Sequence, residues 1–338
     1  MSGERLPPWI QTQLHTLLGQ RGHAWLLHGA SGLGQYELAL GLARAWLCLH
    51  PTEEGACGVC SSCHAIDVRT HADLCVLMPE TEMLERQWPL PEKAQAELDD
   101  KKRKPSKEIR IEAMRDAVDF SQRTSSGGQG KVVLVFPAER MNAITANALL
   151  KTLEEPAGDV KFVLATDSGH QLLPTIRSRC LGHGMAWPEA QAATDWLEHK
   201  GLAPAIARAC LRAAGGRPAD ALQLARNQRD PKAWSQLPRA LQRGDASLLQ
   251  DWSARETIDA LHKLCHDLQL QTQGVAPRYF DAQDLPGQVD FATLSQWGRE
   301  LAAARRTAEH PFHPGLMQEA LVGRAKNVLN SGSKTSRP

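Results

Sequence analysis

Three cysteines stand close together in the chain at Cys57, Cys60 and Cys63, and a fourth, Cys48, precedes them. Two residues separate each cysteine of the trio from the next, so that a tight turn can direct successive thiolates at one metal ion. Four thiolates complete a tetrahedral zinc site and leave no coordination position for a substrate. The spacing therefore predicts a structural zinc ion held by Cys48, Cys57, Cys60 and Cys63.

The fourth ligand is the open point of this prediction. His50 or His64 could replace Cys48, which would then be a small buried apolar residue. An iron–sulfur cluster is less favoured, because nothing else in the sequence suggests redox chemistry. The other four of the eight cysteines are scattered and are expected in the core: Cys75, Cys180, Cys210 and Cys265.

A glycine-rich loop forms a second candidate site. Gly29 and Gly34, with Gly32 between them, fit a phosphate-binding loop between a strand and a helix. That motif continues with Lys, which contacts the β- and γ-phosphates, and with Ser or Thr, which binds Mg²⁺. Here Gln35 and Tyr36 occupy those positions. We predict a degenerate loop that does not bind ATP tightly; a glycine-rich turn without nucleotide ancestry is the alternative.

The third apolar run, residues 131–136, leads to the same prediction. A nucleotide hydrolase ends this strand with an Asp that binds Mg²⁺, usually followed by an acid that activates water. Neither expected position is acidic, because the run ends in Phe136 and Pro137, and Glu139 lies beyond the strand end. Two losses of the same machinery indicate a fold that is kept for its shape.

Alternating strand and helix patterns must position these residues. Strands are predicted at 24–28, 73–78, 131–136 and 160–166. Helices are predicted after the glycine-rich loop, from Asn142, which can act as an N-cap, and from Pro174. Strands joined by helices indicate a doubly wound parallel sheet.

Beyond Pro188 only helical patterns follow, at 188–199, 203–213, 218–226 and, with turns, 231–329. The fold class is therefore α/β plus all-α. Residues 80–107 are rich in charge and proline, and we interpret this segment as a mobile, solvated stretch, with an insertion at 83–107, rather than as a nucleic-acid patch.

Composition limits the function classes. The chain has 338 residues, with 39 Lys and Arg against 38 Asp and Glu, and this net charge of +1 argues against a free-standing protein that grips nucleic acid by bulk charge. No apolar run reaches the roughly 18 residues of a membrane span. The beginning of the sequence lacks the apolar core of a signal peptide, so a cytoplasmic protein is expected.

Taken together, these motifs resemble the delta-prime family of subunits of the bacterial DNA polymerase III clamp loader, within the AAA+ superfamily. The resemblance covers most of the chain and weakens over residues 83–107. It is densest at residues 146–156 (ANALLKTLEEP), 162–166 (FVLAT) and 178–180 (SRC). The cysteine spacing also matches the zinc module of clamp-loader subunits.

The resemblance implies an AAA+ domain with a zinc module at 1–185, a small helical lid at 186–230 and a helical collar at 231–330, followed by a frayed tail at 331–338. It further implies a pentameric ring with a delta subunit and gamma/tau ATPase subunits, which loads a sliding clamp onto primed DNA. Such a subunit is not an enzyme by itself, although it belongs to a DNA-directed DNA polymerase, a nucleotidyltransferase complex.

The resemblance also assigns roles to single residues. Arg179 of the Ser-Arg-Cys tripeptide would act as an arginine finger in a neighbouring subunit's ATP site, with Arg177 as a close alternative. Thr166 takes the sensor-1 position, and Phe136 stands where the ATPase paralogues carry their magnesium-binding Asp. Two other functions remain in competition: an active gamma/tau-like ATPase, and a zinc-dependent nucleic-acid-binding module.

Overall fold

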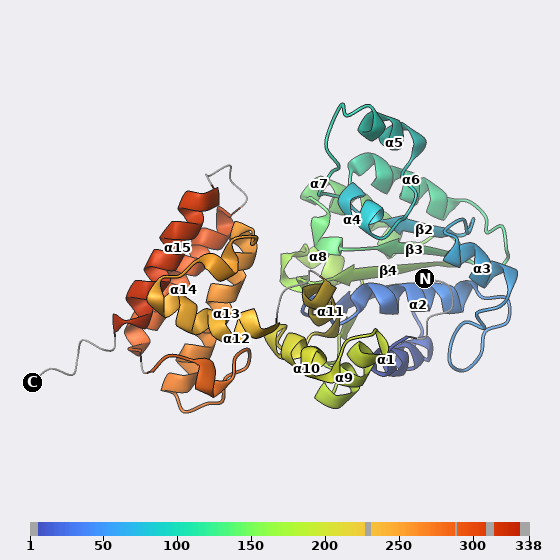
Figure 1. Cartoon of the computed structure of the whole chain (residues 1–338). Coiled ribbons are helices and arrows are strands. Elements are labelled where there is room, and N and C mark those ends of the chain that lie inside the picture. The colour runs from blue at the N-terminus through green and yellow to red at the C-terminus, as the bar shows by residue number, and fades with distance from the viewer. Residues whose placement is uncertain (1–5, 227–230, 288, 309–313, 332–338) are drawn as a thin grey trace, which may run out of the picture. The chain divides into compact units, whose positions relative to one another are not determined.

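The structure is a computed structural model that describes residues 6–226, 231–287, 289–308 and 314–331. The chain divides into two compact units, residues 1–192 and 193–338 (Figure 1). The predicted division into three domains stays a prediction, and the predicted frayed tail lies, except for Ser331, outside the described residues.

A five-stranded parallel sheet forms the centre of the first unit, with strand order β2-β3-β4-β1-β5. The strands are β1 (Ala24–His28), β2 (Leu74–Leu77), β3 (Lys131–Val135), β4 (Val160–Thr166) and β5 (Leu181–Gly184). The four predicted strands are confirmed. The edge strand β5 was not predicted, because its sequence, Leu-Gly-His-Gly, contains two residues that are depleted in strands.

Helices cover both faces of this sheet (Figure 1). The first unit contains α1 (Pro8–Leu18), α2 (Gln35–Leu47), α3 (Ser61–Asp67), α4 (Glu80–Glu85), α5 (Glu92–Asp99), α6 (Ile111–Gln122), α7 (Ala143–Glu154) and α8 (Pro174–Arg177). Helix α7 begins where the sequence predicted, because the side chain of Asn142 accepts a hydrogen bond of 3.0 Å from the N–H of Thr145.

Alternate residues of the strands fill two separate cores. Val133 and Val135 of β3 pack on the side of α6 and α7, whereas Leu134 packs on the side of α1 and α2. Every residue of β3 is buried, as expected for a parallel strand that is covered on both faces. The predicted doubly wound arrangement is therefore present.

The segment predicted to be a mobile insertion carries helices α4 and α5. Glu80, at the start of α4, is 7% exposed and forms ion pairs with Arg103 and Arg110. Arg103 also pairs with Glu97 of α5 at 2.7 Å. The segment thus has ordered secondary structure and internal ion pairs, while its mobility stays a prediction.

The described part of the second unit contains α-helices, short 3-10 helices and connecting loops, and it contains no strand. It contains α9 (Ala190–His199), which begins just before the unit boundary, α10 (Pro204–Ala213), α11 (Pro218–Arg226), α12 (Pro231–Arg243), α13 (Ala254–Thr272), α14 (Phe291–Arg306) and α15 (Pro314–Leu329). Helices α9–α11 bury one hydrophobic cluster, and α12–α15 bury another. These ranges confirm the helical patterns predicted beyond Pro188.

Candidate metal centre and degenerate nucleotide site

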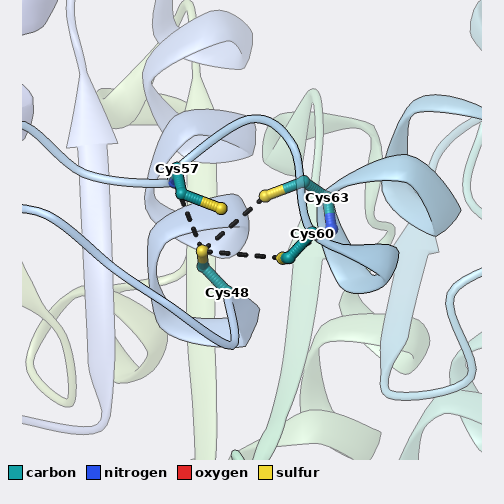
Figure 2. Close-up of side chains that lie close together, drawn as sticks. All are labelled: Cys48, Cys57, Cys60 and Cys63. Carbon is teal, nitrogen blue, oxygen red and sulfur yellow. Dashed lines mark hydrogen bonds between the residues drawn. The ribbon is translucent and has the colours of Figure 1, made fainter.

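All four cysteines of the predicted zinc site come together between α2 and α3 (Figure 2). Cys48 follows the last residue of α2, and Cys57 lies in the connecting loop. Cys60 caps the N-terminus of α3, and Cys63 lies in its first turn. Two helix ends and one short loop therefore fix the four sulfur atoms.

The spacing of the sulfur atoms fits a tetrahedral metal ion. The Sγ atom of Cys48 lies 3.8 Å from that of Cys60 and 3.7 Å from that of Cys63, and all four lie within 4.8 Å of one another. A tetrahedron with Zn–S bonds of about 2.3 Å has S···S edges of about 3.8 Å. His50 and His64 are exposed and lie outside this group, so the group contains Cys48 rather than a histidine.

The protein environment treats the four thiols differently. Burial raises the pKa of Cys48, and it raises the pKa of Cys63 to about 12. Although burial works in the opposite direction, backbone N–H donors lower the pKa of Cys60 to about 6, and the N–H groups of Val59 and Cys60 lower that of Cys57. A bound zinc ion would hold all four as thiolates, because a coordinated thiol loses its proton.

The glycine-rich loop connects β1 to α2, and its carbonyl groups accept hydrogen bonds from side chains of this chain. Gln35, at the position of the phosphate-binding lysine, is 2% exposed and donates a hydrogen bond of 2.7 Å from Nε2 to the carbonyl of Ala30. Leu33 is buried, and its carbonyl accepts a hydrogen bond from Trp9 Nε1 at 3.3 Å. Gly34 has φ +100°, where a side chain would be strained and its Cβ would lie 2.7 Å from Ile10.

Aromatic rings occupy the two positions where the motif expects magnesium ligands. The ring centroids of Tyr36 and Phe136 lie 5.5 Å apart. The guanidinium carbon of Arg86 lies over both rings, 4.4 Å from the Tyr36 centroid and 4.9 Å from the Phe136 centroid. The Tyr36 hydroxyl accepts a hydrogen bond of 2.7 Å from Trp88 Nε1, and burial raises the pKa of Tyr36.

Glu139, the acid that follows β3 in the sequence, is hydrogen-bonded within the chain. Glu139 accepts a hydrogen bond of 2.6 Å from the hydroxyl of Thr166 and one of 3.3 Å from the N–H of Asp167. Thr166 is fully buried, and its oxygen also accepts from the N–H of Ser168 at 3.0 Å. Thr166, which the resemblance places at the sensor-1 position, is thus held by a hydrogen bond to Glu139 at the carboxyl end of β4.

Arg179 lies just before β5 and is engaged within the chain. Its Nε atom donates to Glu154 Oε1 at 2.6 Å, Nη2 binds the same oxygen, and Nη1 donates to the carbonyl of Thr175 at 2.9 Å. The Arg179 side chain is 30% exposed, so solvent and other molecules can reach it. Arg177 is exposed.

Sequence reasoning missed three of these residues: Arg86, Trp88 and Glu154. Arg86 and Trp88 lie in the segment taken as an insertion, and their partners Tyr36 and Phe136 are about fifty residues away in the chain. Glu154 belongs to the ANALLKTLEEP run, but it pairs with Arg179 only because the fold brings the end of α7 next to the residues before β5.

A family described as "DNA polymerase III, delta subunit" matches residues 10–185. Subunit delta' of DNA polymerase III from Pseudomonas aeruginosa is 40% identical over 192 residues, which are 56% of this chain and 52% of that protein. The Escherichia coli subunit delta' is 31% identical over 257 residues, 74% of this chain and 64% of that protein. The chain thus matches between half and two thirds of the length of these two relatives.

A longer match comes from Yersinia pestis, whose subunit delta' is 31% identical over 326 residues, 88% of each chain. Among solved structures, a gamma subunit-related protein of DNA polymerase III from Thermotoga maritima covers 95% of this chain and 99% of its own, with a TM-score of 0.50 and 17% identity, which shows a shared fold. In the described part of the chain, no helix is long and apolar enough to cross a membrane. The family match and the relatives show that the chain belongs to the delta-prime family of DNA polymerase III subunits.

Proposed function

We propose that this chain is a non-catalytic subunit of a DNA polymerase III clamp loader. It joins gamma/tau ATPase subunits and a delta subunit in a pentameric ring that places a sliding clamp on primed DNA in the cytoplasm during chromosomal replication. The names of its delta' relatives support this context, and so does the 32% identity with the Escherichia coli subunit tau over 182 residues.

One observation carries the non-catalytic part of the proposal. The ring atoms of Tyr36 and Phe136 stand where a magnesium-dependent ATPase presents a hydroxyl and a carboxylate. Gln35, which replaces the lysine, is turned onto the loop carbonyl of Ala30 and offers no cation to a phosphate. The site therefore lacks the hydroxyl and the carboxylate that bind Mg²⁺ and the lysine ammonium that binds the β- and γ-phosphates.

Catalytic participation would then occur in trans, through Arg179. A guanidinium is a permanent cation with several donors in one plane, which suits the charge that develops on a transferring phosphoryl group. In the free chain this guanidinium is held by Glu154 and the carbonyl of Thr175. Its entry into a neighbouring ATP site requires exchange of the Glu154 carboxylate for phosphate oxygens.

The cysteine cluster would hold a structural zinc ion. Four thiolates satisfy its tetrahedral preference and leave no open position for a substrate or an activated water. The chain's own contribution is to link the end of α2 to the start of α3 through the ion. This link between the two helices would stiffen that corner of the first unit, and it would take no part in phosphoryl transfer.

Two measurements on the purified full chain test the proposal. We expect calorimetry to detect no micromolar, Mg²⁺-dependent binding of ATP, and we expect co-assembly with the ATPase and delta subunits in size-exclusion chromatography. Tight MgATP binding would favour a gamma/tau-like ATPase. Failure to assemble, together with strongly salt-dependent DNA binding by the isolated chain, would favour the nucleic-acid-binding module.

A further inference from the structure

Trp88 lies on the degenerate nucleotide site although it belongs to the segment that the sequence predicts to be an insertion. Its indole is 8% exposed and belongs to the same hydrophobic cluster as Leu33 and Phe136. Nε1 donates to the hydroxyl of Tyr36 at 2.7 Å. The indole therefore ties residues 80–107 to the second residue of α2.

The chain around Trp88 is built to hold this position. Gln87 adopts the left-handed conformation with φ +57°, which is unfavourable for a residue other than glycine. The turn allows the N–H of Trp88 to donate to the carbonyl of Met83 at 2.7 Å. Arg69, itself at φ +62°, donates to the carbonyl of Gln87 and lies over the Trp88 ring, 5.4 Å from its centroid. Strain of this kind persists where surrounding contacts over-determine the conformation.

Arg86 adds a fixed positive charge at the same place. It lies over the rings of Tyr36 and Phe136, and its Nε forms an ion pair of 3.2 Å with Glu82. Its Nη1 is 4.0 Å from Glu37 in the first turn of α2. The guanidinium therefore joins α4 to both aromatic replacements and to α2.

We propose that Arg86 and Trp88 form a built-in plug of the degenerate nucleotide site. They fill its magnesium end and hold the junction of the glycine-rich loop and α2 in one conformation without a ligand. The inference rests on the proposed function in one respect, namely that loop 29–36 corresponds to a nucleotide site. In an ATPase of this fold, a bound nucleotide holds the junction of the glycine-rich loop and the following helix only while it is present. Here the side chains of Arg86 and Trp88 hold this junction permanently.

The residues of the plug also disfavour the binding of Mg²⁺ at this site. Magnesium requires oxygen ligands at about 2.0–2.1 Å. The hydroxyl of Tyr36 already accepts the Trp88 hydrogen bond, and Phe136 has no oxygen in its side chain. A divalent cation there would also meet the Arg86 guanidinium, and like charges at short distance in a partly buried site repel strongly.

Hydrogen exchange of the full chain, read by mass spectrometry, tests the plug. The readout is the amides of residues 29–40, including Leu38, whose N–H makes the first helical hydrogen bond of α2 to the carbonyl of Gly34 at 2.9 Å. We expect Trp88→Ala to raise exchange there by about tenfold or more. Trp88→Phe, which keeps a ring but loses the N–H donor, should give a smaller increase, and so should Arg86→Gln.

The matched control is Phe120→Ala, a partly buried aromatic residue of α6 that packs on the opposite face of the sheet. It should leave exchange at residues 29–40 unchanged. Unchanged exchange at residues 29–40 in Trp88→Phe and Arg86→Gln, or equal increases in Phe120→Ala, would overturn the plug. If Trp88→Ala does not fold, those two milder variants still decide the question. Titration of the wild-type chain with MgATP is the second measurement, because tight binding would refute the proposed function and the plug together. Unchanged hydrogen exchange in the variants would refute the plug alone.

Discussion

At the scale of single residues, three features support the proposed function: a glycine-rich loop without the expected magnesium ligands, a partly exposed arginine and a cluster of four cysteines that could hold a metal ion. Tyr36 and Phe136 lie together at the positions where the motif of a magnesium-dependent ATPase has its metal ligands. Arg179 remains reachable at the surface, and the four clustered cysteines lie at tetrahedral spacing. The two predictions that follow at this scale concern the arginine and the metal.

Arg179→Ala should lower the clamp- and DNA-stimulated ATPase of a reconstituted ring while leaving assembly and zinc content unchanged. Arginine fingers in other phosphoryl-transfer enzymes contribute about 10³–10⁵ in rate at their own site. The whole-ring loss should be smaller, because other subunits serve the remaining sites. Arg179→Lys should rescue poorly, since an ammonium lacks the planar fork.

Arg177→Ala is the matched control for this prediction and should have a milder effect. A ring that carries Arg179→Ala and loads clamps at the wild-type rate would refute the assignment. A ring that fails to assemble would instead show that the ion pair between Arg179 and Glu154 has a structural role.

Elemental analysis of chain purified without chelator should give one zinc ion per chain. Cys60→Ser should lose the metal, because a tetrahedral site with three thiolates is incomplete. Cys75→Ser is the control, since this cysteine lies in β2 outside the cluster, and it should keep full zinc content. Full zinc content in Cys48→Ser would remove Cys48 from the ligand set and leave the other three.

At the scale of elements, one buried carboxylate fixes the connection that leads into β3. Asp73 precedes β2, is 1% exposed, and accepts hydrogen bonds from the N–H groups of Ser126 at 2.8 Å and Gly127 at 2.7 Å. The hydroxyl of Ser125 donates to it at 3.1 Å. Although burial works in the opposite direction, these donors lower the pKa of Asp73.

Asp73→Asn should lower the free energy of unfolding by about 1–3 kcal/mol at neutral pH, because it weakens hydrogen bonds to a buried charge. A carboxyl with a lowered pKa stabilises the fold above its unfolded value of about 3.9, and this contribution is lost as pH falls through the folded pKa. The difference between wild type and variant in urea unfolding should therefore shrink below about pH 4. An equal difference at pH 3 and pH 7 would contradict this origin.

At the scale of the whole molecule, each unit buries its own hydrophobic clusters, so damage to one cluster should remain local. Asp267 of α13 is fully buried and accepts hydrogen bonds from the N–H groups of Arg278, Tyr279 and Phe280. It organises the loop that follows α13 and places Phe280 in the core of α12–α15.

Asp267→Ala should destabilise helices α12–α15 by about 3 kcal/mol, since three backbone N–H groups, of which that of Phe280 is buried, lose a buried carboxylate acceptor. We expect faster hydrogen exchange in residues 231–329 and unchanged exchange in the sheet of the first unit. Leu316→Ala is the control, because this side chain is 66% exposed and should be nearly neutral. Equal acceleration in the sheet would show that the two units unfold together.

The sequence by itself determined the local features. Apolar runs and caps located four strands, the helices beyond Pro188 and three helices of the first unit, including the start of α7 at Asn142. Helices α1, α3, α4, α5 and α6 were not predicted. The cysteine spacing located a cluster that could hold a metal ion, and the replacements Gln35 and Tyr36 predicted a degenerate loop. These features depend on residues that are close in the chain, so periodicity and spacing are sufficient to find them.

Only the tertiary structure decided what those features contact. The glycine-containing edge strand β5 becomes a strand through pairing with β1, since its own residues have little strand preference. Charge and proline in residues 80–107 predicted an insertion, because composition records nothing of the partner that Trp88 finds at Tyr36. Contacts of this kind join residues far apart in sequence, and the order β2-β3-β4-β1-β5, which no local pattern encodes, brings them together.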